Sequence, residues 1–310
     1  MITNFEIADC GIFGGHTQLT TTAAVSLDNC LNGALSNILI SDIITTVSFK
    51  ALQMSGCENC NVDNTVVSNN TTTGSFQGFN LGKCEQIIFN TCQVMNCSST
   101  ITTCTAILVE SSGGISFNKC SVRSNAASNQ AFTAYSLVSS TNNYFSGCVA
   151  LGNTSLGNNV SFIYDGSNQN IMTDCAAIAN SSTSGGQSFA GFRGLNTANG
   201  NALIGCLALY NNAVTLNSIG MVFEATVGSN WLVRNCQFNR NIGTAGSFGI
   251  IEQPVAFTQL CFQNSAFNNG TTIANQITGF PAGSLTTPAA PATSNINNIT
   301  SPWTNGAITT

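Results

Sequence analysis

Cysteine recurs along this chain at nearly constant intervals, and such a period is compatible with few folds. The successive spacings are 28, 28, 27, 31 and 30 residues, and they separate Cys92, Cys120, Cys148, Cys175, Cys206 and Cys236. The same step reaches Cys10, Asn37, Thr65 and Ser265, which gives ten register positions, called the anchors below. A period of about 20 to 50 residues is the signature of a repeat architecture, in which each coil buries its apolar face against the next coil.

Residues at a constant offset from the anchors test this period. Three residues before the anchors stand ten apolar residues, Ile7, Ala34, Val62, Phe89, Phe117, Phe145, Met172, Leu203, Val233 and Phe262. Two residues after the anchors stand ten more, Ile12, Leu39, Val67, Val94, Val122, Ala150, Ala177, Ala208, Phe238 and Phe267. Only 43% of the chain is apolar, so two wholly apolar columns indicate that these positions face a shared core.

The local pattern around the anchors is that of β-strands. Apolar and polar residues alternate, as from Lys119 to Arg123, and β-branched and aromatic residues are frequent. A second apolar run follows in many repeats, as at Ala106 to Val109 or Phe162 to Tyr164. The sequence therefore predicts an all-β solenoid of about ten coils of 27 to 31 residues, with two or three short strands per coil.

Asparagine forms a further column five residues after the anchors. Its members are Asn70, Asn125, Asn153, Asn180, Asn211 and Asn241. Asparagine tolerates the left-handed backbone region, so we expect this column to form the turn between two strands. Amides stacked about 4.8 Å apart can also hydrogen-bond to one another as a ladder.

These columns, together with the low content of charged residues, resemble the right-handed parallel β-helix of the pectin-lyase-like group. The resemblance covers residues 1–270. It implies an architecture that carries polysaccharide lyases, hydrolases, tailspikes, adhesins and structural proteins, so it does not select one activity. Residues 271–310 are rich in Pro, Ala, Thr and Asn, and we expect an irregular tail that caps the last coil through Trp303 or, alternatively, serves as a linker. Because Ile7 already occupies an inward column, we expect the first coil to be continued by more solenoid or covered by a partner, including end-to-end or homo-oligomeric association.

The cysteines are predicted to be structural. Cys30, Cys57 and Cys84 form a second short column, and Cys fills a stacked interior site as a small hydrophobe. Side chains on in-register parallel strands point the same way, which suits disulfide geometry poorly. Unpaired thiols fit a reducing compartment, burial, or a piece of a larger surface protein. His16 is the only histidine, and we predict no catalytic residue, cofactor or metal from these groups.

A column about 18 residues after the anchors is rich in charge. It contains Asp28, Ser55, Lys83, Glu110, Val138, Asp165, Arg193, Glu224 and Glu252. We expect it to follow one outward face, where Glu110, Asp165, Arg193, Glu224 and Glu252 are the candidate groove or binding residues. Glu224 and Glu252 on adjacent coils would be a weak metal candidate, and Asp165 and Glu224, roughly 9 to 10 Å apart, an acid and base pair.

Composition makes some classes of function less expected than others. Charged residues make up 6% of the chain and the net charge is −5, so nucleic-acid binding is not expected. No signal peptide or membrane-spanning segment is visible in the sequence. We predict a non-catalytic rod that is structural or binds a polysaccharide or protein partner. The alternative is a polysaccharide lyase or glycoside hydrolase, with Ca²⁺ only in that case, although the Asp-Asp, Asn-Thr-Asp, Gly-His-Gly and Arg-Ile-Lys motifs of that group are missing.

Overall fold

The computed structural model describes most of the chain as a stack of β-coils. The residues described are 2–14, 23–183, 188–214, 216–224, 231–244, 246–252, 260–262, 265–266, 277–278 and 296–297, with side chains up to residue 250 apart from Phe248. His16 and Trp303 lie outside them, as does most of the predicted tail. Every regular element within them is a strand. The part of the chain described contains no helix long and apolar enough to cross a membrane.

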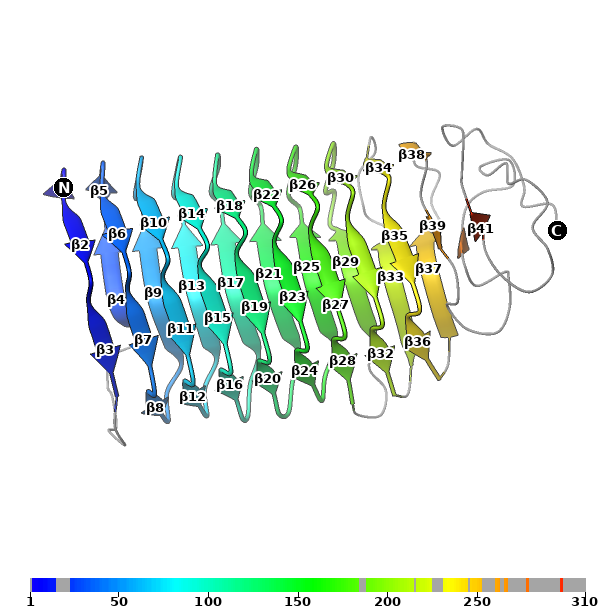
Figure 1. Cartoon of the computed structure of the whole chain (residues 1–310), viewed down its shortest axis with the longest axis horizontal. Coiled ribbons are helices and arrows are strands. Elements are labelled where there is room, and N and C mark those ends of the chain that lie inside the picture. The colour runs from blue at the N-terminus through cyan, green and yellow to red at the C-terminus, as the bar shows by residue number, and fades with distance from the viewer. Residues whose placement is uncertain are drawn as a thin grey trace.

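Eight complete coils, each of four strands, form the solenoid, and incomplete coils flank them (Figure 1). Strands at equivalent places in successive coils pair in parallel, so each coil adds one strand to each of four sheets. The parallel solenoid that the cysteine period predicts is therefore confirmed. A fourth strand per coil was not predicted, because it is only two residues long and leaves no apolar pattern.

The long sheet contains the seven-residue strands. Its members are β4 (Ala23–Asp28), β9 (Phe49–Ser55), β13 (Phe76–Gly82), β17 (Cys104–Glu110), β21 (Phe132–Val138), β25 (Asn159–Asp165), β29 (Phe189–Leu195), β33 (Asn217–Phe223), β37 (Gly246–Glu252) and β40 (Ile277–Thr278). The two-residue strands form the corner sheet, with β8 (Ile44–Thr45), β12 (Thr71–Thr72), β16 (Ser98–Ser99), β20 (Ala126–Ala127), β24 (Thr154–Ser155), β28 (Ser181–Ser182), β32 (Asn212–Ala213) and β36 (Ile242–Gly243).

Two sheets of mainly three-residue strands flank the cysteine column. The pre-cysteine sheet contains β2 (Glu6–Ala8), β6 (Ala34–Ser36), β10 (Asn61–Asp63), β14 (Ile88–Asn90), β18 (Ser116–Asn118), β22 (Tyr144–Ser146), β26 (Ile171–Thr173), β30 (Ala202–Ile204), β34 (Leu232–Arg234) and β38 (Leu260–Phe262). The post-cysteine sheet contains β3 (Gly11–Phe13), β7 (Leu39–Ser41), β11 (Val66–Ser68), β15 (Gln93–Met95), β19 (Ser121–Arg123), β23 (Val149–Leu151), β27 (Ala176–Ile178), β31 (Leu207–Leu209), β35 (Gln237–Asn239), β39 (Ser265–Ala266) and β41 (Ile296–Asn297). A separate pair joins β1 (Ile2–Thr3) to β5 (Cys30–Leu31), and β41 pairs with β39 in the antiparallel sense.

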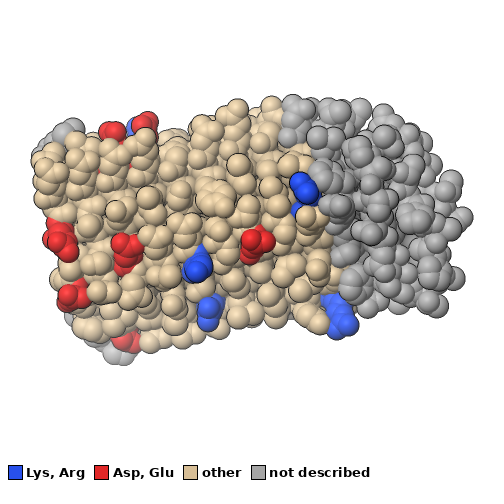
Figure 2. Space-filling model, turned by 45° about the horizontal axis from the view of Figure 1, so that its top comes forward, with Lys and Arg blue, Asp and Glu red and all other residues tan. Residues whose placement is uncertain are grey.

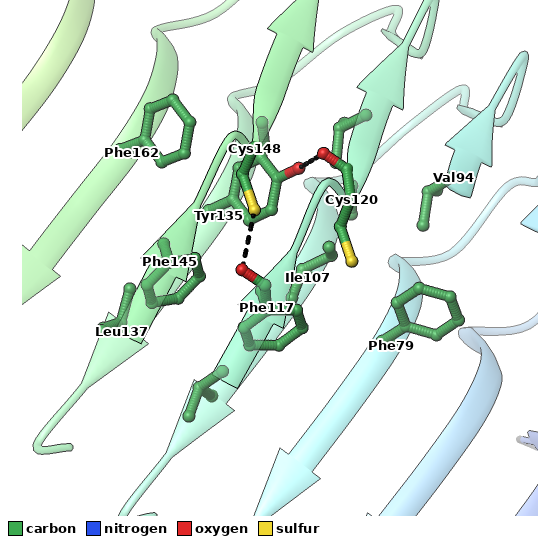
Figure 3. Packing of buried hydrophobic residues seen from close by; sticks show 14 of the residues in the cluster. Phe79, Val94, Ile107, Phe117, Cys120, Tyr135, Leu137, Phe145, Cys148 and Phe162 are labelled. Atoms are coloured by element: carbon green, nitrogen blue, oxygen red, sulfur yellow. Dashed lines mark hydrogen bonds between the residues drawn. The ribbon is translucent and has the colours of Figure 1, made fainter. Parts of the chain in front are cut away.

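Aromatic rings stacked from coil to coil fill much of the core. The ring centroids of Phe89 and Phe117 lie 4.7 Å apart, and those of Phe117 and Phe145 lie 4.9 Å apart. Tyr135 stacks on Phe162 at 4.7 Å, and its hydroxyl donates a 2.9 Å hydrogen bond to the Cys120 carbonyl (Figure 3). Each such side chain is fully buried, and burial of a Phe contributes about 1.5 to 3 kcal/mol. The core is thus continuous along the coils.

The predicted inward columns are correct except at their ends. In the second repeat Leu35 and Ile40 face the core, and not Ala34 and Leu39, because Val62 pairs with Leu35 and Val67 with Ile40. In the last repeat the partner of Val233 is Cys261 and not Phe262, while Phe267 lies outside the described residues. A one-residue slip turns a side chain to the other face of a strand. The slip could not be recognised in the sequence, because the predicted residue and the residue that faces the core are both apolar.

The asparagine column does not supply the left-handed turn. The residue just before it has the positive φ, 52° at Ser124, 52° at Ala179 and 58° at Tyr210. The asparagine itself then points inward, and Asn125, for example, is fully buried. The prediction of a turn at this corner was right, and the residue assigned to the left-handed conformation was wrong by one.

Candidate functional site

The predicted asparagine ladder forms over five coils. Each amide donates to the next along the solenoid, at 3.1 Å from Asn125 to Asn153 and 2.9 Å from Asn153 to Asn180. The remaining steps are 3.2 Å from Asn180 to Asn211 and 2.9 Å from Asn211 to Asn241. The same Oδ1 atoms accept a backbone N–H, as Asn180 does from Asn153 at 3.0 Å. The ladder is therefore an internal scaffold, since its amides are bonded to one another and to the backbone.

A second buried ladder was missed. Asn143 donates to Asn170 and Asn170 to Asn201, each at 2.9 Å, just before the pre-cysteine strands. At the next equivalent position the indole of Trp231 donates to the Ala198 carbonyl at 2.8 Å. These three asparagines lie five residues before Cys148, Cys175 and Cys206. The signal is therefore present in the sequence as a short column of three asparagines.

The cysteine columns are unpaired and buried. The thirteen cysteines whose side chains are described are all free, and all but Cys10 are buried. Cys92 and Cys148 donate to carbonyl oxygens of the preceding coil, Val62 and Phe117, at 3.3 Å in both cases. Burial raises the pKa of the Cys97 thiol to about 12 and that of Cys104 well above its ordinary value. Nowhere in the described ranges do three His, Cys, Asp or Glu side chains gather as a metal site.

The charged column is only partly in register. Gly82, Glu110, Val138 and Asp165 follow one another directly, and the next position is Leu195. Arg193 lies two residues earlier on β29 and pairs with Ile163. The predicted row therefore contains Glu110 and Asp165 but not Arg193.

Glu224 and Glu252 are not register partners. Glu252 pairs with Phe223, the residue before Glu224. The stack of two carboxylates expected from the sequence needs Glu224 opposite Glu252, and the register does not place them so. The side chain of Glu252 lies outside the described residues.

Arg193 and Glu224 form an ion pair. Nε and Nη2 of Arg193 both contact Oε1 of Glu224 at 2.6 Å, and the two side chains are 28% and 26% exposed. Asp165 has a different partner, since Asn196 donates to its Oδ1 at 2.7 Å. The structure thus brings together one pair of the five predicted site residues, while Glu110 is exposed at the end of β17.

A pocket opens beside this ion pair, on the outer side of the long sheet. Its volume is about 180 Å³. Five apolar residues line it. Phe189 of β29 is one, and the other four, Val160, Ala190, Ile219 and Val222 of β25, β29 and β33, pack as a small cluster separate from the main core. Asn158, Ser188 and Asn217 add polar atoms from the other end of the same strands, and Arg193 and Glu224 complete the wall. The sequence predicted the ion-paired residues but not this apolar floor.

No protein-family model matches the chain, and no curated protein matches it either. The strand topology and the register define the class, a parallel β-solenoid. The likeness to the pectin-lyase-like group remains a resemblance in the repeat pattern.

Proposed function

We propose that this chain is a non-catalytic β-solenoid, a structural or surface-interaction rod whose partner is a polysaccharide or a protein. The observation that carries the proposal is the composition of the pocket, where Glu224 is the one carboxylate among the described lining residues and is held by Arg193. Glycoside hydrolysis generally uses two carboxyl groups that flank the bond to be cleaved. Asp165, the predicted second group, is held by Asn196 and does not line the pocket.

The outer surface supports a role in contact. On the face shown in Figure 2, charged side chains are few. Polar residues form rows at one residue per coil, in which Asn64 donates to Asn37 at 2.9 Å and Asn118 donates to Asn90 at 3.0 Å. Such rows repeat every 4.8 Å or so. A surface with this regular spacing suits an extended, repetitive partner.

Product release from polysaccharides tests the proposal. Wild type and Glu224→Gln are incubated with acidic and neutral polysaccharides, with and without Ca²⁺, and reducing ends and unsaturated products are measured. We expect no turnover from either protein, together with co-sedimentation of the wild type with an insoluble polysaccharide or a partner protein. Turnover that Glu224→Gln abolishes would overturn the proposal and favour the polysaccharide lyase or glycoside hydrolase of the pectin-lyase-like group.

A further inference from the structure

The size of the pocket on the long sheet restricts what it could hold. Pockets for drug-sized ligands are typically about 300 to 1,000 Å³, and this one is about 180 Å³. Three adjacent strands, β25, β29 and β33, build it, so its floor spans two coil spacings, about 10 Å. A ligand of one six-membered ring fits this space, whereas an extended peptide is too long for it.

The floor is apolar and nearly buried, although it lies on the outer side of the long sheet. Val160 and Ala190 are each 5% exposed, Ile219 is 7% exposed and Val222 is 3% exposed. Val160 pairs with Ala190, and Ala190 with Ile219, so the three side chains form a row at one level of the sheet. Outward positions of the same sheet toward the N-terminus are polar instead, such as Gln77 and Thr105, which pair with each other. On its N-terminal side the apolar row therefore begins at Val160, whose partner in the preceding coil is Thr133.

The ion pair offers one donor group and one acceptor atom. Arg193 uses Nε and Nη2 on a single oxygen of Glu224. Among the described residues, Nη1 of Arg193 and Oε2 of Glu224 make no hydrogen bond. A guanidinium and a carboxylate side by side carry no net charge, and their spare N–H groups and oxygen match the two hydroxyls of a vicinal diol.

The opposite rim is polar and uncharged. Asn158 accepts the Ser188 N–H at its Oδ1 over 3.0 Å, which fixes that amide and leaves its NH₂ group for a ligand. Asn217, the first residue of β33, lies on the same rim. The pocket therefore combines an apolar floor, amide and hydroxyl groups at one end and a neutral charge pair at the other.

We propose that this pocket binds one ring of a neutral sugar, with a C–H face on the apolar floor and a vicinal diol on Arg193 and Glu224. The inference rests on the proposed function and names the ligand class of the rod. A uronate or an amino sugar is disfavoured because the pair of Arg193 and Glu224 carries no net charge that would offset the desolvation of an ionic group.

Calorimetric titration with purified oligosaccharides tests the inference. Neutral oligosaccharides of glucose, mannose, galactose and xylose are compared with oligogalacturonate, up to about 10 mM, a range that detects millimolar dissociation constants. We expect saturable binding of at least one neutral series and none of the uronate. Arg193→Gln is expected to weaken binding by about tenfold or more, since a hydrogen bond to a charged group is lost. Arg123→Gln, on the exposed side of β19, leaves binding unchanged.

A variant that fills the pocket distinguishes an effect on binding from an effect on folding. Ala190→Leu fills the floor and is expected to abolish binding. Ala176→Leu is its matched control, because Ala176 is also 5% exposed on the outer side of a strand, β27, but lies away from the pocket. Thermal unfolding of both variants shows whether they fold like the wild type.

Three results would overturn the inference. These are unchanged binding in Ala190→Leu, preference for the uronate, or no saturable binding of any neutral series. If no neutral sugar binds and no turnover occurs, the sugar pocket is refuted and the proposed non-catalytic rod stands. Turnover would refute the rod itself.

Discussion

Two rows of residues run along this solenoid, the buried asparagine ladder and the outer charged column. They differ in how regularly the predicted residue recurs from coil to coil. In the buried row every amide from Asn125 to Asn241 bonds to the amide of the next coil. In the outer row, which begins with Asp28 and continues through Glu110 and Asp165, Leu195 takes the place predicted for Arg193. The strands of both rows are equally well paired, so the backbone does not cause the difference.

The contrast shows what a buried polar group demands. An amide without a partner inside the core costs about 1 to 3 kcal/mol. An insertion that displaced one ladder member would therefore lower the free energy of unfolding. Outside the wall, water replaces a missing partner. The outer row therefore tolerates Leu195 among its charged positions, and Arg193, which pairs with Val222, reaches Glu224 diagonally across the same face.

Alkaline pH should have the largest effect on stability, because it ionises groups that are buried in the folded chain. Burial raises the pKa of Cys97 to about 12, whereas the thiol ionises near its ordinary value once the chain unfolds. A group whose pKa is raised by folding stabilises the fold below its unfolded pKa, and that contribution is lost as the pH rises. We expect the free energy of unfolding to fall between pH 9 and 12, by roughly 4 kcal/mol from Cys97 alone at 1.36 kcal/mol per unit.

Urea unfolding at a series of pH values, in the presence of a reductant, measures this loss. Cys97→Asn is the informative variant, because Cys97 occupies the asparagine column between Asn70 and Asn125. It removes the titrating thiol and continues the ladder, so its stability should fall less steeply with pH. Cys10→Ser, at the exposed cysteine, should behave as the wild type. An equally steep fall in Cys97→Asn would show that the buried thiol does not contribute.

Removing one rung of the buried ladder should have the next largest effect. Asn180→Ala leaves the backbone N–H and the amide of Asn153 without their acceptor, and we expect a loss of about 3 kcal/mol in unfolding free energy. Asn118→Ala is the matched control, since Asn118 donates a similar 3.0 Å bond to Asn90 on the partly exposed outer side. It should cost under about 1 kcal/mol. Equal losses in the two variants would remove the distinction between the rows.

The outer ion pair should contribute least to stability. Arg193 and Glu224 are about one quarter exposed, and exposed ion pairs contribute about 0 to 1 kcal/mol. We expect Arg193→Gln to change the unfolding free energy by less than about 1 kcal/mol, with little further change on adding salt. A loss of several kcal/mol would show that this outer pair is part of the scaffold, and its role in binding would then need another variant.

The sequence predicted the interior far better than the exterior, for physical reasons. The columns that contain Phe117 and Val122 were found because only apolar residues fill a dry stack, and a constant offset from the periodic cysteines reveals them. Arg193 was misplaced because the extra residues of its repeat fall in a corner. The spacing is 27 from Ser155 to Ser182 but 30 from Asn159 to Phe189. No periodic pattern fixes where a corner takes an insertion.

The candidate site was predicted in part. Arg193 and Glu224 were singled out as charged residues in a chain with few of them, and the structure pairs them. The apolar floor could not be predicted, since Val160 and Ile219 read as core residues in an alternating strand. Only the register, which places them on the outer side, distinguishes them. The domain boundary at residue 270 and the cap stay predictions.

The direction of the hydrogen bonds gives this rod an unusual mechanical character. Because the strands lie across the axis, the bonds between coils run along it, and each coil is held only by its neighbours. Tension applied to the two ends of the chain would therefore peel off terminal coils one after another. A coil of 27 residues, the spacing from Cys148 to Cys175, releases about 90 Å of extended chain. Such a molecule lengthens in discrete, nearly equal steps, and the coils that are still stacked keep their shape throughout.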